Sequence, residues 1–311
     1  MKRFILKNTS YQYLETAFGE WLDILGFAQG TVKSMPAIIR EFLCHLEQNN
    51  VASINQLQHR HIKSYHGYIN TRAHQREGGA LSNNYINKHM QAIAKFLEYL
   101  HHKGVQGMPS IAIKLGKIER KEIEILATHE VKKLFELCNR EHATDKETIL
   151  QARDKAMLVI YYSCGLRKTE GASVSIDDID FDARVLHVRK GKNYKERFVP
   201  FNKTNAAYLQ EWIYDYRSQL VKGKAEPRLF TCMKGGPVDG DVLYRRFKLL
   251  QQQAVETSLA GKNVGLHALR HSIATHLLQA GMGLEKISRF LGHSSLASTQ
   301  IYTHLISKGN E

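Results

Sequence analysis

The sequence predicts a mainly α-helical protein with a small β-sheet. Over most of the 311 residues, apolar side chains recur three or four positions apart, as they do on the buried face of a helix. Only residues 185–188 and 197–199 read as strands, and the basic segment between them is predicted to be the turn of a β-hairpin. The helical pattern is lost between Val105 and Ala127. We therefore expect two domains, residues 1–110 and 126–311, with a linker at 111–125.

Four helices are predicted in the first domain. The first covers residues 11–26, the second is capped by Thr31, the third follows Gln58, and the fourth runs from a cap at Ser82 to Gly104. Each carries an apolar stripe, and the stripe of the fourth is the strongest: Ile86, Met90, Ile93, Leu97 and Leu100. The four stripes are enough for one small helical core.

The second domain is predicted to be helical around the hairpin. Thr128 is expected to cap its first helix, and further helices are expected at 151–163, 206–220, 241–255 and 266–278. A short helix with Leu284, Ile287 and Leu291 should end at Gly292. Ser294 or Ser295 is expected to cap a last segment that leads to Tyr302.

Composition limits the classes of function. The net charge of +14 and a pI near 9.5 indicate a polyanionic partner, most simply nucleic acid, although a basic surface without any ligand is the alternative. No apolar run is long enough to span a bilayer and the first residues do not resemble a signal peptide, so a cytoplasmic protein is expected. The four cysteines lie far apart and predict neither a zinc site nor disulfides.

Candidate chemistry gathers near the carboxyl end. His267 and Arg270 lie three apart near the start of a helix, where backbone N–H groups favour a phosphate. His293 follows the glycine that ends the next helix, and Tyr302 comes soon after. A second guanidinium, Arg167, follows a glycine turn after an apolar run. A phenol beside imidazoles and guanidinium groups suits attack on a phosphodiester, because fixed donors must meet the negative charge that develops on phosphate.

Five motifs occur in a defined order along the second domain. They are Gly-Leu-Arg-Lys-Thr-Glu at 165–170, Gly-Lys before Lys-Glu-Arg-Phe-Val-Pro at 191–200, His-Ala-Leu-Arg-His at 267–271, Leu-Gly-His at 291–293 and Ile-Tyr-Thr-His at 301–304. Together they resemble the tyrosine recombinase, or phage integrase, family over roughly residues 126–304. The resemblance implies an N-terminal four-helix, SAM-like core-binding domain and a C-terminal mixed α/β catalytic domain.

The resemblance also implies roles for six catalytic residues. Tyr302 would be the nucleophile that forms a 3′-phosphotyrosyl link, and Lys192 would protonate the leaving 5′-oxygen. Arg167, Arg270 and His293 would hold the phosphate oxygens, and His267 would exchange a proton with the nucleophile. Glu170 would support Arg167, with His271 as a further supporting residue, and neither a metal nor another cofactor is implied. Lys190 and Lys195 share the loop of Lys192, and Asn193 replaces the glycine usual in the family after that lysine.

The implied partner is double-stranded DNA with inverted-repeat core sites. We expect a monomer in free solution that forms a homo-tetramer on two duplexes, with no membrane association. Basic side chains of the first domain are the expected phosphate contacts, although each alone could be plain surface: Lys33, Arg40, Arg60, Lys63, Arg72, Arg76, Lys88 and Lys95.

Other functions compete with recombination. A silent DNA-binding or architectural protein on the same fold is one, and the intact residue set argues against it. A type IB topoisomerase-like nicking and resealing enzyme is the other. The i, i+4 pair His267 and His271 lacks the glutamate of a metalloprotease helix, because Ala268 stands at that position. No extra domain precedes the first helices and nine residues follow Tyr302, so we expect a compact, Xer-like enzyme with short or different subunit contacts.

Overall fold

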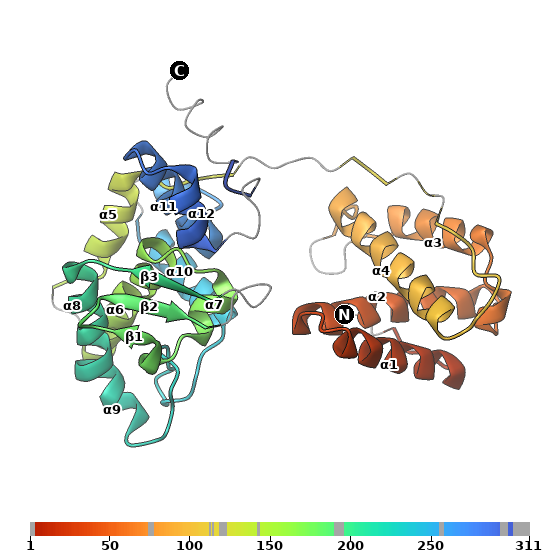
Figure 1. Cartoon of the computed structure of the whole chain (residues 1–311), viewed down its shortest axis with the longest axis horizontal. Helices are drawn as coiled ribbons and strands as arrows, with labels where there is room; N and C mark the ends of the chain where they lie inside the picture. Colours follow the sequence, from red (N-terminus) through yellow and green to blue (C-terminus); the bar gives the residue numbers. More distant parts are fainter. Residues whose placement is uncertain are drawn as a thin grey trace. The chain divides into compact units, whose positions relative to one another are not determined.

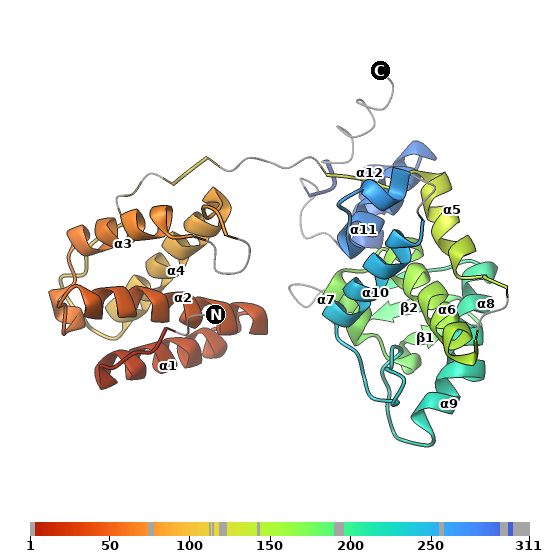
Figure 2. The same cartoon turned by 180° about the vertical axis from the view of Figure 1, so that it is seen from behind.

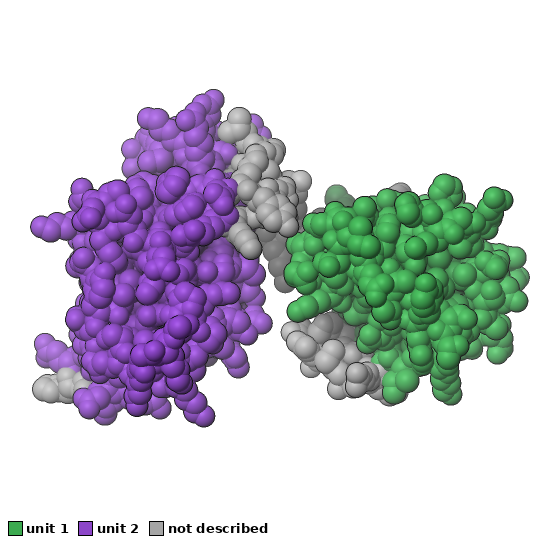
Figure 3. Space-filling model, turned by 60° about the horizontal axis from the view of Figure 1, so that its bottom comes forward, with its two compact units in different colours: residues 1–121 green, residues 122–311 purple. Residues whose placement is uncertain are grey.

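The computed structural model describes residues 4–73, 78–111, 113, 115–117, 123–141, 144–189, 196–254, 258–292 and 298–300. The chain is mostly helical with one three-stranded sheet, so the expected fold class is confirmed (Figure 1). It forms two compact units, residues 1–121 and 122–311 (Figure 3), and each has a hydrophobic core of its own. None of the helices that the structure describes is both long and apolar enough to cross a membrane.

The described residues of the first unit form four α-helices, as predicted. They are α1 (Thr9–Ile24), α2 (Gln29–Gln48), α3 (His59–Thr71) and α4 (Asn83–His102), with a short 3-10 turn at Ile54–Gln56. Ser82 caps α4 as expected, because its Oγ accepts a hydrogen bond from the Tyr85 N–H. The cap predicted at Thr31 is wrong: α2 begins at Gln29, and the Thr31 N–H already bonds to the Ala28 carbonyl.

The segment after α4 bonds to that helix before the chain leaves the first unit. The side chain of Asn87 donates to the Gly116 carbonyl at 2.8 Å and accepts from the Gly116 N–H at 3.1 Å. A Cβ on Gly116 would lie 2.9 Å from the side chain of Asn83, so a larger residue here would displace that side chain. Part of the predicted linker is therefore attached to α4.

The second unit contains more elements than the sequence predicts. Its helices are α5 (Thr128–Leu137), α6 (Asp145–Leu158), α7 (Lys168–Ser173), α8 (Lys203–Gln210), α9 (Ser218–Val221), α10 (Gly240–Gln252), α11 (Leu266–Gln279) and α12 (Leu284–Leu291). π-Helical segments at Val159–Ser163 and Glu211–Arg217 extend α6 and α8, and 3-10 turns lie at Ile176–Asp178 and Ser258–Gly261.

Local capping explains where two of these helices begin. α6 starts before residue 151 because Thr144 and Glu147 form a capping box, in which each side chain bonds to the backbone N–H of the other. Thr128 does not cap α5: Ala127 is the N-cap, and Glu130 accepts a hydrogen bond from the Ala127 N–H at 2.8 Å.

The predicted hairpin is confirmed. β2 (Val185–Val188) pairs antiparallel with β3 (Arg197–Pro200), with Leu186 opposite Val199, and a short strand not predicted from the sequence, β1 (Ile179–Asp180), completes the order β1-β2-β3. The sheet and α10 lie on opposite sides of this unit, as the front and back views show (Figures 1 and 2). Between them, α6 and its π-helical end supply fully buried residues such as Met157, Ile160 and Tyr161.

Candidate active site

A glycine turn brings Arg167 to the start of α7. The apolar run of α6 ends in the π-helical segment, and the chain reverses at Gly165, which has a φ of +62°. A Cβ at this position would lie 2.9 Å from Cδ2 of Leu291, so α12 can pack here only against glycine. Leu166 is buried, and Arg167 becomes the N-cap residue of α7.

The carboxylate of Glu170 accepts hydrogen bonds from both the side chain and the backbone of Arg167. Arg167 Nη1 donates to Glu170 Oε1 at 2.6 Å, and the Arg167 N–H donates to Glu170 Oε2 at 3.0 Å. The side chain of Glu170 is 3% exposed, whereas that of Arg167 is 21% exposed. The guanidinium is therefore anchored on its inner side and still reaches the surface.

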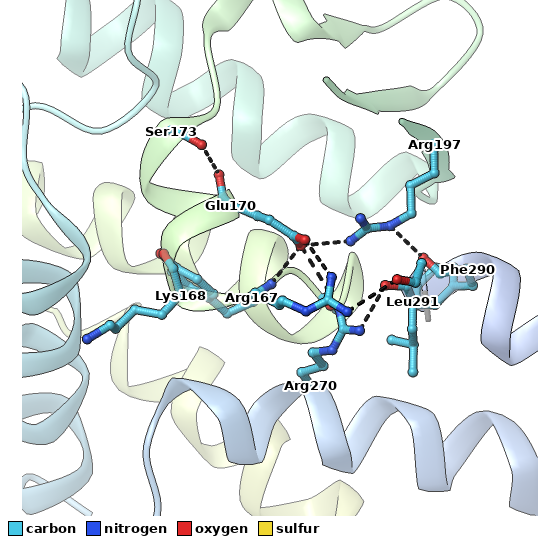
Figure 4. A network of polar contacts seen from close by, with 11 residues as sticks. Arg167, Lys168, Glu170, Ser173, Arg197, Arg270, Phe290 and Leu291 are labelled. Atoms are coloured by element: carbon cyan, nitrogen blue, oxygen red, sulfur yellow. Dashed lines mark hydrogen bonds and ion pairs between the residues drawn. The ribbon is translucent and has the colours of Figure 1, made fainter. Parts of the chain in front are cut away.

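Arg270 approaches the same carboxylate from α11. Its Nη1 donates to the Gly165 carbonyl at 2.6 Å and lies 4.0 Å from Glu170 Oε2, and its Nη2 donates to the Leu291 carbonyl at 2.8 Å. Arg167 and Arg270 are thus brought together at one carboxylate, while their grip on one phosphate stays a prediction. Figure 4 shows both guanidinium groups beside Glu170 and facing the end of α12.

Arg197, on β3, is a third guanidinium that the sequence interpretation missed. Its Nη2 donates to Glu170 Oε2 at 2.9 Å and its Nε donates to the Phe290 carbonyl at 3.0 Å, while its side chain is only 7% exposed (Figure 4). The strand pattern contained a signal for it. If Val199 faces the core, period-two alternation also turns Arg197 inward, and a buried arginine needs a partner.

Three successive carbonyls at the end of α12 each accept from a different arginine. Arg197 bonds to the Phe290 carbonyl, Arg270 to that of Leu291, and Arg167 to that of Gly292 at 3.2 Å. The last carbonyls of a helix have no partner within it and carry partial negative charge, so guanidinium donors fit there. Gly292 has a φ of +66°, as expected for a helix-ending glycine.

These contacts set the charge state of Glu170. Burial alone would raise its pKa, but the hydrogen bonds and charge of Arg197, followed by the bonds from Arg167, outweigh burial and hold the pKa at about 2. Glu170 is therefore ionised at neutral pH, and one negative charge faces three positive ones. The cluster keeps an excess of positive charge, which suits an anionic substrate.

His267 lies at the surface near the start of α11, next to this cluster. Partial desolvation of the ring by neighbouring protein atoms lowers its pKa. The positive charges of Arg270, Arg167 and Lys168 lower the pKa further, whereas the negative charge of Glu170 opposes them. A neutral imidazole at pH 7 can accept a proton. His271, one turn later, has a pKa of about 4 because of burial and the nearby His267 and Arg270.

Comparison with known proteins decides the family. Residues 124–308 match the model of the phage integrase family, which is more than half of the chain. The chain belongs to the phage integrase family. It is similar to the tyrosine recombinase XerC of Bacillus subtilis (strain 168), with 30% identity over 93% of this chain and 90% of the relative. It is also similar to XerD of Staphylococcus saprophyticus, with 28% identity over 94% and 95%.

Two solved structures share the fold of this phage integrase. The XerH site-specific recombinase bound to a palindromic difH substrate has a TM-score of 0.67 at 20% identity and covers 94% of this chain and 80% of its own. The Tn1549 transposon integrase, in complex with transposon right end DNA, has a TM-score of 0.66 at 16% identity over 93% and 94%. The family model and the named relatives confirm the expected family and its enzyme class, the tyrosine recombinases.

Three of the six expected catalytic residues of this phage integrase are placed by the structure, and three are not. Arg167 and Arg270 lie beside Glu170, and His267 lies next to this cluster, as described above. Lys192, His293 and Tyr302 lie outside the described residues, so their roles stay predictions. Across the described part of the chain, no group of three His, Cys, Asp or Glu side chains could hold a metal ion.

The basic residues expected to contact DNA fall into two groups. Lys33, Arg60, Lys63 and Lys88 are exposed and, among described residues, have no carboxylate within ion-pair distance. Others already have an acidic partner: Arg40 pairs with Glu15 at 2.6 Å, Arg72 with Glu41 at 2.7 Å and Lys95 with Glu98 at 2.5 Å. The side chain of Arg72 is only 11% exposed, so its observed role is internal, whereas Arg76 lies outside the described residues.

Proposed function

We propose that this tyrosine recombinase cuts and rejoins DNA at specific sites through a covalent link between Tyr302 and a 3′-phosphate. The observation that carries the proposal is the pair Arg167 and Arg270, whose guanidinium groups meet at one buried carboxylate beside His267. The names of the relatives and the DNA complexes of the two structural neighbours support DNA as the substrate.

The chemistry follows from the charges. The phenol oxygen of Tyr302 attacks the phosphorus, the bond to the 5′-oxygen breaks, and Lys192 gives that oxygen a proton. Negative charge that develops on the nonbridging oxygens is met by Arg167, Arg270 and His293, while His267 accepts the phenol proton. The 5′-hydroxyl of a partner duplex then attacks the phosphotyrosine and releases Tyr302. Each step exchanges one phosphate ester for another, so no external energy source is required.

The assembly is part of the same proposal. Exchange between two duplexes requires four active sites, hence a homo-tetramer of chains that are monomers in free solution. Core sites with inverted repeats would place two protomers on each duplex, and the palindromic substrate of the XerH structure supports this arrangement. Because the substrate would be DNA, we also propose a cytoplasmic location. Lys33, Arg60, Lys63 and Lys88 are the proposed phosphate contacts of the first unit.

A covalent trapping experiment tests the proposal. The protein is incubated with a pool of duplexes that have a randomised centre and a nick near it, so that the cleaved fragment diffuses away and the adduct cannot reseal. Wild-type protein should yield DNA–protein adducts that survive denaturation, and Tyr302→Phe should yield none. Absence of adduct from both, with DNA binding intact, would show an architectural protein instead.

The DNA sequences enriched among the trapped adducts then serve to distinguish recombination from topoisomerase-like resealing. Two copies of an enriched site are placed on one supercoiled plasmid. A recombinase produces deletion or inversion products from this plasmid, whereas a nicking and resealing enzyme relaxes it without recombinants. Relaxation alone would contradict the proposal.

A further inference from the structure

We infer that Arg197 is a positioning residue of the reaction proposed above: it fixes Glu170 and the end of α12, and through them Arg167 and Arg270. The inference rests on the proposed function, since it assigns Arg197 a part in strand cleavage. The side chain of Arg197 is 7% exposed, and its Nη2 and Nε already donate to Glu170 and to the Phe290 carbonyl. We therefore assign its effect to these neighbours.

The contacts of Arg197 join two parts of the site that are far apart in sequence. One guanidinium nitrogen holds Oε2 of Glu170 at 2.9 Å, and Nε holds the Phe290 carbonyl at 3.0 Å. The following carbonyls, of Leu291 and Gly292, orient Arg270 and Arg167. A planar guanidinium can serve both acceptors at a fixed spacing, which a lysine ammonium on a flexible stem does not reproduce.

Arg197 also lies against the backbone that precedes His293. A Cβ built on Gly292 would lie 2.9 Å from Cδ and Nη1 of Arg197. The side chain of Arg197 therefore fills the space beside the turn from which the chain continues to His293. Loss of this side chain would leave both the turn and the α12 carbonyls without their support on the β3 side.

Charge sharing gives a second reason for the assignment. Glu170 divides one negative charge between Arg197 and Arg167. Without Arg197, the carboxylate would be left to Arg167, with Arg270 at 4.0 Å, and would neutralise Arg167 more completely. An Arg167 with less effective charge is a weaker partner for the phosphate. Arg197 thus keeps Glu170 from competing with the substrate.

The experiment uses a nicked duplex that carries a site enriched in the trapping experiment above. It measures cleavage of this duplex by the wild type, Arg197→Met, Glu170→Gln and the double variant. Methionine keeps length without charge, and glutamine keeps the shape of Glu170. We expect Arg197→Met to slow cleavage about tenfold or more while DNA affinity stays within about twofold, as for a residue coupled to a catalytic group. In the Glu170→Gln background most of this penalty should disappear. An equal penalty in both backgrounds would overturn the inference.

The pH dependence provides a readout that a purely structural role would not move. Arg167, Arg197 and Arg270 face Glu170 from α7, β3 and α11, and His267 adds a titrating group on α11. Without the bonds of Arg197, burial should raise the pKa of Glu170. Protonation then removes its charge as glutamine does, so the ratio of variant to wild-type rate should rise as pH falls from about 8 to 5. Taking the ratio removes the contribution of His267 common to both proteins. A ratio independent of pH would also overturn the inference.

Matched controls separate folding from positioning. Arg246→Met removes another arginine from a buried pair, with Asp154 at 2.6 Å, and should lower stability without slowing cleavage. If Arg197→Met does not fold, Arg197→Lys takes its place in both measurements, because it keeps the charge but not the double contact. A wild-type protein that forms no adduct would refute the proposed function itself, whereas a normal wild type with unaffected Arg197 variants would refute only this inference.

Discussion

Substitution of Gly292 by alanine tests whether the end of α12 is built around Arg197. Gly292 has a φ of +66°, and a new Cβ would lie 2.9 Å from two atoms of the Arg197 side chain. Gly281, after α11, is the matched control, because its φ is +87° but no described atom lies within 4 Å of a built Cβ. Both alanines incur the left-handed backbone cost of about 1–2 kcal/mol. Only the alanine at 292 must displace a neighbour.

The size of the difference follows from what Arg197 would lose. A displaced guanidinium weakens its bonds to Glu170 and to the Phe290 carbonyl, and a hydrogen bond to a charged group contributes about 1.5–3 kcal/mol. We expect Gly281→Ala to lower the free energy of unfolding of the second unit by about 1–2 kcal/mol. Gly292→Ala should lower it by about 3–5 kcal/mol and should also slow strand cleavage.

Tryptophan fluorescence can report the unfolding of the second unit separately from that of the first. The chain has two tryptophans, Trp21 in the core of the first unit and the fully buried Trp212 in that of the second. In a Trp21→Phe background, urea unfolding followed by fluorescence reports Trp212 alone. Equal losses of stability for the two alanine variants, or unchanged cleavage in Gly292→Ala, would refute the reasoning.

Three further predictions concern charge and pH. Arg270→Ala should reduce covalent adduct formation about 10²- to 10³-fold and leave DNA binding in a gel-shift assay nearly unchanged, because a preorganised donor acts mainly in the transition state. Equal losses of adduct formation and DNA binding would contradict this prediction. Cleavage should stay constant above about pH 6.5 and fall below it as His267 takes up a proton at its lowered pKa, and His267→Asn should abolish that fall. Burial lowers the pKa of His89 to about 4, so the first unit should lose up to about 3 kcal/mol of stability as pH falls from 6.5 to 4. If an NMR titration showed the His89 imidazole to titrate near pH 6.5, this loss of stability would be excluded.

Local patterns predicted most of the helices, and their limits are visible at particular residues. Ser82 caps α4 because a serine before an amphipathic run satisfies the first free N–H groups. Thr31 and Thr128 failed as caps because helix starts also depend on the backbone of the preceding residue, here Ala28 and Ala127. The π-helical segments that extend α6 and α8 left no signal in the three-to-four periodicity.

The candidate site could be predicted only where its chemistry is local or matches a family motif. His267 and Arg270 are one helical turn apart, and Arg167 follows a glycine turn. Arg197 lies in the motif at 191–200 and on the inward side of its strand, but its partners, Glu170 and the end of α12, are far away in the sequence. Its role was therefore missed. The strand alternates as usual, but it buries Arg197 together with Val199 and leaves Phe198 65% exposed. A buried charge beside an exposed aromatic residue marks a position where packing alone does not determine the sequence.

The choice of acceptors explains how two arginines can be fixed and still serve a phosphate. Three further carboxylates around Arg167, Arg197 and Arg270 would orient these side chains, but they would also cancel the charge needed for the substrate. Backbone carbonyls orient a guanidinium as effectively and remove no net charge. The α12 end offers three of them in succession, while Glu170 supplies only one negative charge. The direction of the guanidinium groups is therefore set largely by a helix end, and their net charge remains available for the phosphate.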